Sequence, residues 1–162
     1  MASVSRVPGN AAAIALIVLP LVALGMRFIM PGWGILVLLF ISPLLVLTYA
    51  LAVVIAATGF LTARAAFLLS RVRWRGITAA WIAAVSSVIA SFFMIDGGDS
   101  GEYGAPFTLL LGYTSPPVEL GNVVGLVMLV FLMIGIAAFV WLVIEWIIAL
   151  VQRRKRSTPI SI

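Results

Sequence analysis

One carboxylate in this sequence lies within a strongly apolar segment, and it is the first candidate for chemistry. Glu145 interrupts an otherwise uncharged run between Asn122 and Val151. A charged group in bilayer hydrocarbon costs roughly 2.5–3.5 kcal/mol on insertion scales, so it needs a partner or a function. We expect an ion pair or polar contact between helices, with an arginine of segment 64–75 as partner. An interfacial carboxylate with no special role and a proton- or cation-coupling site are the alternatives.

The other four acidic residues all lie in a glycine-rich segment, 96–121. Asp96, Asp99 and Glu102 are spaced by three, and carboxylates in a flexible loop can bind a hard cation such as Ca²⁺. Their spacing does not match the EF-hand pattern, and nothing around them predicts the cleft that paired-carboxylate glycoside chemistry needs. We therefore expect a solvated loop without a bound metal.

Several classes of catalytic site are excluded by residue type. The chain has no Cys and no His, which excludes disulfides, thiol nucleophiles, thiolate or imidazole zinc sites, histidine-ligated haem and a Ser-His-Asp triad. No glycine-rich phosphate-binding motif precedes a predicted helix. The sequence therefore predicts no catalytic residue, no cofactor and no metal.

The composition predicts an all-α integral membrane protein. Of 162 residues, 64% are hydrophobic and 9% are charged, and the mean hydropathy is +1.28. A transmembrane helix needs about 20 apolar residues, and the chain has room for little more than such helices. The sequence predicts a single transmembrane domain, 1–162, with four spans at about 11–30, 35–63, 76–95 and 122–151.

Two of the predicted spans are irregular. The first has an alternative interpretation as a signal peptide, with Arg6 in the charged region, 11–22 as the apolar region and 23–25 as a weak cleavage site. The second belongs to an uncharged run, 34–63, that is longer than the bilayer core. It must tilt, bend at Pro43 or protrude from the membrane.

The charge distribution predicts the orientation. All basic residues except Arg27 fit a topology in which both termini, segment 64–75 and the tail 152–162 are cytoplasmic. A short turn at 31–34 and the long acidic loop 96–121 are then extracytoplasmic. The net charge of +5 is explained by this topology, so nucleic acid is not expected as a partner. The preference for Arg over Lys, with abundant Ala and Gly, is typical of a GC-rich genome, so we expect an actinobacterial or similar host and a location in the bacterial cytoplasmic membrane.

Three of the predicted spans, the second, third and fourth, carry small residues on one helical face. Lipid tails are as apolar as leucine, so helices associate in a bilayer through close packing along small residues. In the third span this face lies opposite bulky residues such as Trp81 and Val85, which we expect to face lipid. The predicted helix-packing residues are Gly76, Ala80, Ala83, Ala84, Ser87 and Ser91 in the third span and Gly121, Gly125 and Gly135 in the fourth.

Two shorter segments suggest contacts at the membrane surface. The apolar segment 107–113 is too short to cross a bilayer; we expect it at the outer interface, with a re-entrant segment and a lid over the helix ends as alternatives. The arginines between the second and third spans are expected to fix orientation, with contact to anionic lipid headgroups as the alternative. The residues concerned are Arg64, Arg71, Arg73 and Arg75.

These features predict a non-catalytic multi-pass membrane protein. The most regular pattern is the small-residue packing face, which favours an accessory subunit of a larger membrane complex or a small self-associating effector. A holin-like pore former, a channel or a small transporter is the alternative. A phage-encoded exclusion protein and a lipid-acting membrane enzyme are less favoured. The expected partners are membrane lipids and either other membrane subunits or a second copy of the chain.

Overall fold

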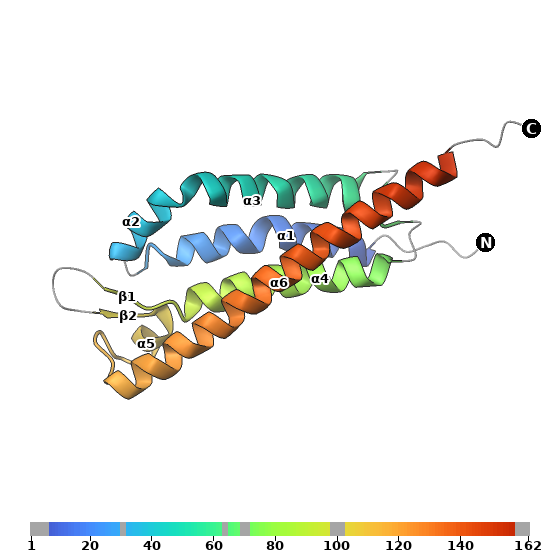
Figure 1. Ribbon diagram of the computed structural model, residues 1–162. Helices are drawn as coiled ribbons and strands as arrows, with labels where there is room; N and C mark the ends of the chain where they lie inside the picture. The colour runs from blue at the N-terminus through green and yellow to red at the C-terminus, as the bar shows by residue number, and fades with distance from the viewer. Residues whose placement is uncertain (1–6, 30–31, 63–64, 69–71, 98–102, 158–162) are drawn as a thin grey trace, which may run out of the picture.

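The computed structural model describes residues 7–29, 32–62, 65–68, 72–97 and 103–157, and it is mostly helical. Four helical segments are long and apolar enough to cross a membrane, which confirms the predicted number of spans. They run side by side (Figure 1). These segments are Val7–Met26, Ser42–Leu61, Arg73–Phe92 and Val118–Arg154.

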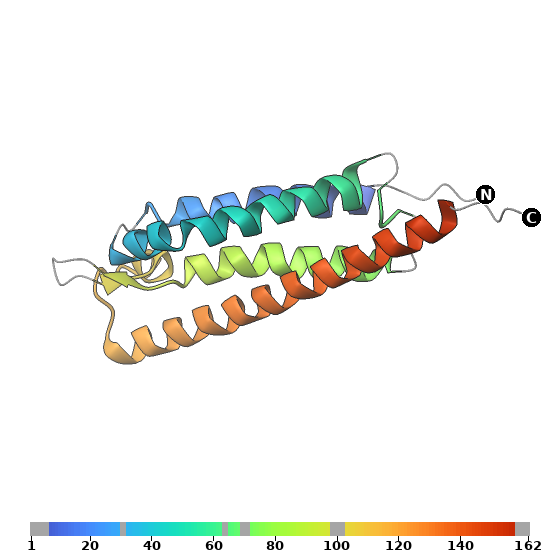
Figure 2. The same ribbon diagram turned by 45° about the horizontal axis from the view of Figure 1, so that its top comes forward.

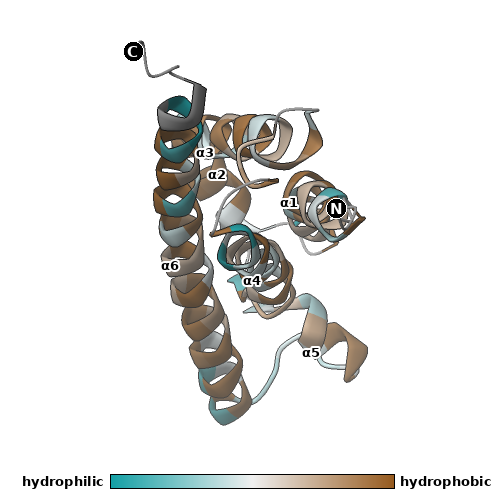
Figure 3. Cartoon of the chain, turned by 90° about the vertical axis from the view of Figure 1, so that its right-hand side faces the viewer, coloured by the Kyte–Doolittle hydropathy of each residue, from teal (hydrophilic) through white to brown (hydrophobic). Residues whose placement is uncertain are grey.

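The elements are α1 (Val7–Met26), α2 (Trp33–Phe40), α3 (Ser42–Ile55), a π-helical turn η1 (Ala56–Leu61), α4 (Arg73–Phe92), β1 (Asp96–Gly97), β2 (Tyr103–Gly104), α5 (Pro106–Leu110) and α6 (Val118–Ser157). Helix α4 is central and packs against α1 and α6, while α1 also contacts α3 and η1 (Figure 3). Strands β1 and β2 pair antiparallel, with Asp96 opposite Gly104. The buried core is rich in alanine, which lets the helix backbones approach closely.

The second predicted span, 35–63, is not one continuous helix. Helix α2 ends at Phe40, and α3 begins at Ser42 with Pro43 in its first turn. Proline lacks a backbone N–H and is tolerated at that position, where the N–H would have no partner within the helix. The chain therefore does not bend at Pro43 within one helix. It breaks at Ile41, between α2 and α3, two residues before the proline.

After η1 the chain turns back into the bundle through residues 65–68. The amides of Ala66 and Phe67 donate to the carbonyls of Thr58 and Gly59 at 2.9 and 3.0 Å, so they satisfy acceptors near the helix end. The second span therefore does not continue as a helix through these residues. Two predicted lipid contacts, Arg64 and Arg71, lie outside the described residues.

The Phe67 ring occupies a site between η1 and α4. It is buried, and it stacks on Phe60 with 4.7 Å between the ring centroids. A Cβ added at Gly76 would lie 2.5 Å from a carbon of this ring, and one added at Gly59 would lie 3.0 Å from it. Both glycines therefore leave the space that Phe67 fills.

The boundaries of the other spans differ from the predicted ones. Helix α1 starts earlier than residue 11, and α4 is shifted toward the N-terminus relative to 76–95. Helix α6 has 40 residues, about 60 Å at ~1.5 Å per residue, and extends past 122–151 at both ends. It crosses the bundle at an angle (Figure 2). The outer segment 96–121 accordingly ends where α6 begins, at Val118.

The apolar segment 107–113 contributes most of the short helix α5. Thr108 is buried, and its hydroxyl accepts from the Ala105 amide at 2.9 Å. The Phe107 ring lies 4.7 Å from that of Phe93 at the end of α4. Leu110 and Leu111 are exposed. This geometry places two large apolar side chains on the surface beside the end of α4, and their contact with the outer interface stays a prediction.

Candidate functional site

Glu145 is fully buried between α4 and α6 and has two partners. Its Oε1 lies 2.6 Å from Arg75 Nη2 and accepts a hydrogen bond of 2.8 Å from Trp141 Nε1. Arg75 is in the first turn of α4, and Trp141 precedes Glu145 by one turn of α6. Of the arginines in segment 64–75 that the structure describes, Arg75 is therefore the one that pairs with Glu145. The contact joins α4 and α6 at the end of the bundle where α4 begins, with Arg73 and Arg75 in its first turn.

The Glu145–Arg75 pair is unevenly buried. The Arg75 side chain is 62% exposed, whereas that of Glu145 is 1% exposed. Within the described part of the chain, Glu145 Oε2 is buried and has no hydrogen-bond partner. Because Arg75 is solvated in any case, the cost of desolvating the pair falls mainly on the carboxylate.

We expect the two partners to respond differently to substitution. Arg75→Gln leaves the buried carboxylate without its cation and should lower the free energy of unfolding by about 1–2 kcal/mol, between typical values for exposed and buried pairs. Glu145→Leu replaces a buried charge by an apolar group of similar size and should cost less than Arg75→Gln. Denaturant unfolding in an uncharged detergent measures both. A larger cost for Glu145→Leu would show that the carboxylate itself is net stabilising.

A second ion pair lies at the opposite end of α4. Arg27 Nη2 and Asp96 Oδ2 are 2.5 Å apart, and both side chains are 4% exposed. Arg27 Nη1 also donates to the Met94 carbonyl at 3.1 Å, and Asp96 Oδ1 accepts from the amides of Gly34 and Gly97 at 2.8 and 2.9 Å. The pair joins the end of α1, the start of α2 and strand β1. The predicted solvated loop is therefore wrong for Asp96, because its carboxylate is enclosed by these donors.

Two glycines make room for the Asp96 carboxylate. An ideal Cβ at Gly32 would lie 2.6 Å from Asp96 Oδ1, and one at Gly34 would lie 2.7 Å from Oδ2. The sequence predicts only a turn for the 31–34 segment. One signal for the ion pair was available: Arg27 is the one basic residue at the predicted outer side, where the positive-inside rule disfavours it, so it needs an acidic partner.

The remaining acidic residues of the outer segment offer no site in the described structure. Asp99 and Glu102 lie outside the described residues, so their spacing with Asp96 stays untested. Glu119 is exposed in the first turn of α6. Among residues that the structure describes, no three or more of His, Cys, Asp and Glu form a group that could hold a metal ion.

The predicted helix-packing residues lie largely inside the chain's own bundle. Their burial has a direct cause at Gly135, where a Cβ would lie 3.2 Å from Ser86 Cβ of α4. On the opposite face of α4, Trp81 and Val85 are exposed. The buried members are Gly76, Ala80, Ala83, Ala84, Ser91 and Gly121, and the half-buried ones are Ser87, Gly125 and Gly135. The small face of α4 therefore meets helices of the same chain.

Side-chain hydroxyl and indole groups also connect the helices. Ser91 Oγ donates to the Ala23 carbonyl of α1 at 2.6 Å. Tyr49 of α3 donates to a carbonyl of α1 at 3.2 Å, and Trp146 of α6 donates to Thr58 of η1 at 3.0 Å. Ser87 Oγ donates within its own helix, to Ala84, at 2.7 Å. These polar side chains thus find hydrogen-bond acceptors within the bundle.

The two ion pairs and several of these hydrogen bonds connect segments that are distant in the sequence, such as the end of α1 and strand β1 through Arg27 and Asp96. Family models, curated proteins and solved structures were compared with the chain, and none of them matches it. The polar contacts lie at both ends of α4 and along its length, where they fix the neighbouring helices relative to one another.

Proposed function

We propose that this chain is a non-catalytic multi-pass membrane protein that works through helix association, as an accessory subunit of a larger membrane complex or as a self-associating effector. The observation that carries the proposal is the exposure of α6. In its most apolar window only 11% of the residues are buried within the chain, against 28%, 33% and 50% for the other spans. Helix α6 therefore offers the largest membrane-embedded surface to another protein.

One face of α6 has the pattern of a packing surface. Its residues recur at spacings of three and four, as in helices that pack at a small left-handed crossing angle, and all of them are exposed. Ala137 lies at its middle, and a small residue there lets a second helix approach closely. This α6 outer face consists of Leu126, Val130, Met133, Ala137, Trp141, Ile144 and Ile148.

Trp141 connects this surface to the buried carboxylate. The Trp141 side chain is 37% exposed, yet its indole N–H donates inward to Glu145, whose Oε1 also pairs with Arg75. A large aromatic side chain whose orientation is already fixed loses little conformational entropy on binding, and such residues often dominate interface energies. The Glu145 site thus supports association by fixing a side chain of the α6 outer face.

The bonding of the polar groups favours association over permeation. A water-filled path would need polar side chains directed toward it. The hydroxyls of Ser87 and Ser91 donate to backbone carbonyls, and Glu145 is paired with Arg75. These interactions support a packed bundle that presents an outer surface.

The proposed orientation places both termini in the cytoplasm of a bacterial cell and the 96–121 segment outside the cytoplasmic membrane. The start of α1 and the end of α6 lie at the same end of the bundle (Figure 1). Arg73, Arg75 and the α6 arginines belong to that end, in agreement with the positive-inside rule. Arg27, at the other end, is neutralised by Asp96.

A matched pair of substitutions tests the proposed surface. Ala137→Trp places a bulky group on the α6 outer face and should weaken association at least tenfold, measured as recovery of the co-purifying partner or oligomer from a mild detergent. Ala50→Trp makes the same change at an exposed position of α3 and should leave recovery unchanged. Equal recovery with the two variants would contradict the assignment of this face.

A further inference from the structure

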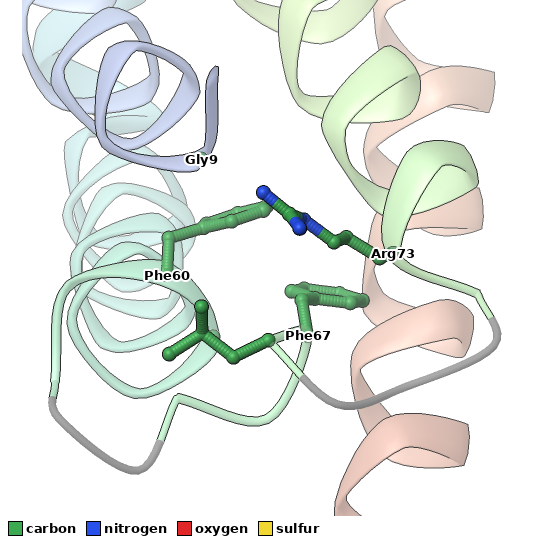
Figure 4. A pocket seen from close by; sticks show the side chains of 6 residues that line it. Gly9, Phe60, Phe67 and Arg73 are labelled. Atoms are coloured by element: carbon green, nitrogen blue, oxygen red, sulfur yellow. The ribbon is translucent and has the colours of Figure 1, made fainter. Parts of the chain in front are cut away.

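The two ends of the bundle differ in how they enclose apolar side chains. Where α4 begins, the rings of Phe60 and Phe67 stack on each other inside the bundle (Figure 4). At the opposite end, the short helix α5 leaves three such side chains on the surface. Leu110 is 77% exposed, Leu111 51% and Tyr113 43%. We call these three residues the α5 tip.

The chain holds the α5 tip in a fixed position beside α4. The Phe107 ring packs against Phe92 and Phe93 at the end of α4, with 5.9 and 4.7 Å between the ring centroids. Thr108 is buried, and its hydroxyl accepts from the Ala105 amide and donates to the Ala105 carbonyl, both at 2.9 Å. The exposure of the tip is therefore a property of a packed segment.

The backbone amides of the tip are paired within the chain. Those of Leu111 and Tyr113 both donate to the Thr108 carbonyl, at 3.1 and 2.9 Å, and that of Gly112 donates to the Leu109 carbonyl at 2.9 Å. Gly112 has a φ of 83°, which a residue without Cβ adopts at little steric cost. Backbone groups in hydrocarbon must find partners within the protein. These bonds therefore suit a segment that enters a lipid layer.

The position of α5 favours lipid as its partner. It lies in the chain between the end of α4 and the start of α6, two helices that are long enough to cross a membrane. In the view along the bundle, α5 lies to the side of α4 and outside the other helices, whereas a lid would cover the helix ends (Figure 3). Segment 103–118 contains no charged residue, so no charge opposes its entry into a lipid layer.

We propose that the α5 tip is an anchor in the lipid leaflet on the side of segment 96–121, with Leu110 and Leu111 in the hydrocarbon and Tyr113 at the headgroup level. This inference depends neither on the association through the α6 outer face nor on which side of the membrane the segment faces. Because the segment is uncharged, the anchor recognises the apolar part of the leaflet and not a particular headgroup. Through Phe107 it fixes the depth of the end of α4.

Spin-labelled single cysteines test the anchor, since the chain has no cysteine of its own. The purified full-length chain in phosphatidylcholine vesicles carries a nitroxide at Leu110→Cys. Electron paramagnetic resonance measures its collisions with O₂, which concentrates in hydrocarbon, and with a water-soluble nickel chelate. Leu47→Cys, exposed in α3, is the hydrocarbon reference, and Arg154→Cys, exposed near the end of α6, is the water reference.

We expect the Leu110 label to collide with O₂ and to be protected from the nickel chelate, as the Leu47 label is. The same result is expected in phosphatidylglycerol vesicles. Access to nickel equal to that of the Arg154 label would place the tip in water and overturn the proposal. A label that neither reagent reaches would be covered by protein, such as a second copy of the chain, and would also overturn it.

A charge at the tip provides a second test. With the label at Leu111→Cys, the additional substitution Leu110→Glu should shift the label toward the water reference, because a carboxylate is costly in hydrocarbon. The matched substitution Leu110→Ile should leave the label in place. Leu110 is largely exposed, so neither change removes a contact on which folding depends. An equal position of the label in the two variants would contradict an anchor in the hydrocarbon.

Discussion

Replacing Asp96 with alanine should lower the free energy of unfolding by about 3–5 kcal/mol, the usual cost of removing one partner of a buried ion pair. The substitution leaves the Arg27 guanidinium buried with the Met94 carbonyl as its remaining partner, and it removes the acceptor of the Gly34 and Gly97 amides. Denaturant unfolding in an uncharged detergent, followed by tryptophan fluorescence, measures the loss.

Two further variants separate the buried pair from a general effect of charge. Glu119→Ala removes an exposed carboxylate at the same end of the bundle and should change stability by less than about 0.5 kcal/mol. The double variant Arg27→Met with Asp96→Leu removes both buried charges and should recover much of the stability lost in Asp96→Ala. A small effect of Asp96→Ala, similar to that of Glu119→Ala, would mean that the pair is solvated in the protein.

The substitution Gly76→Ala should destabilise the protein by about 1–3 kcal/mol, as overpacking of a filled core does. The added Cβ would lie 2.5 Å from the Phe67 ring, so either the ring or α4 must move. Phe67 has little room to yield, because it is buried and already stacked on Phe60. Thermal unfolding in detergent measures the effect.

Gly25→Ala is the matched control, since nothing lies within 4 Å of the added Cβ there. Alanine favours helix over glycine by up to about 1 kcal/mol, so this variant should be neutral or slightly more stable. Phe67→Leu combined with Gly76→Ala should recover stability relative to Gly76→Ala alone, because the smaller side chain removes the close contact. Equal effects of the two glycine substitutions would show that Phe67 does not occupy this space.

The sequence is sufficient to predict the class of fold and the number of spans. Each span needs about 20 apolar residues, and this requirement is local, so hydropathy along the chain reveals it. The break before Pro43 is also partly predictable, because proline restricts the helix around it. The boundaries of the helices are harder to predict from the sequence. Helix α6, for example, continues to Ser157 through a basic segment that hydropathy places outside the span.

The polar contacts between helices are harder to predict, because they join residues that are distant in the sequence. Arg27 and Asp96 are 69 positions apart, and they lie near the ends of two different predicted spans. Glu145 stands out in the sequence because it interrupts an apolar run, but its pairing with Arg75 depends on how α4 packs against α6. The burial of Phe67 has no local signal, since its apolar neighbours fit an interfacial helix equally well.

The small-residue pattern predicts a packing face, but only the structure shows which helices pack against it. Periodicity identifies a face on which Ala80 and Ala84 lie together, and it does not distinguish contacts within the chain from contacts with a partner. Both residues are buried within the bundle. The surface that we propose for association is the α6 outer face, whose central small residue, Ala137, has large apolar neighbours that resemble a lipid-facing sequence.

The mass of the intact protein, extracted from its native membrane in a mild uncharged detergent, tests the association most directly. One chain has a mass of 17.3 kDa. We predict a particle with a larger protein mass, either a multiple of this value or this chain together with another membrane protein, and we predict that Ala137→Trp reduces it to a single chain. A protein mass of 17.3 kDa for the unmodified protein, with lipid and detergent as the only bound material, would contradict the proposed function.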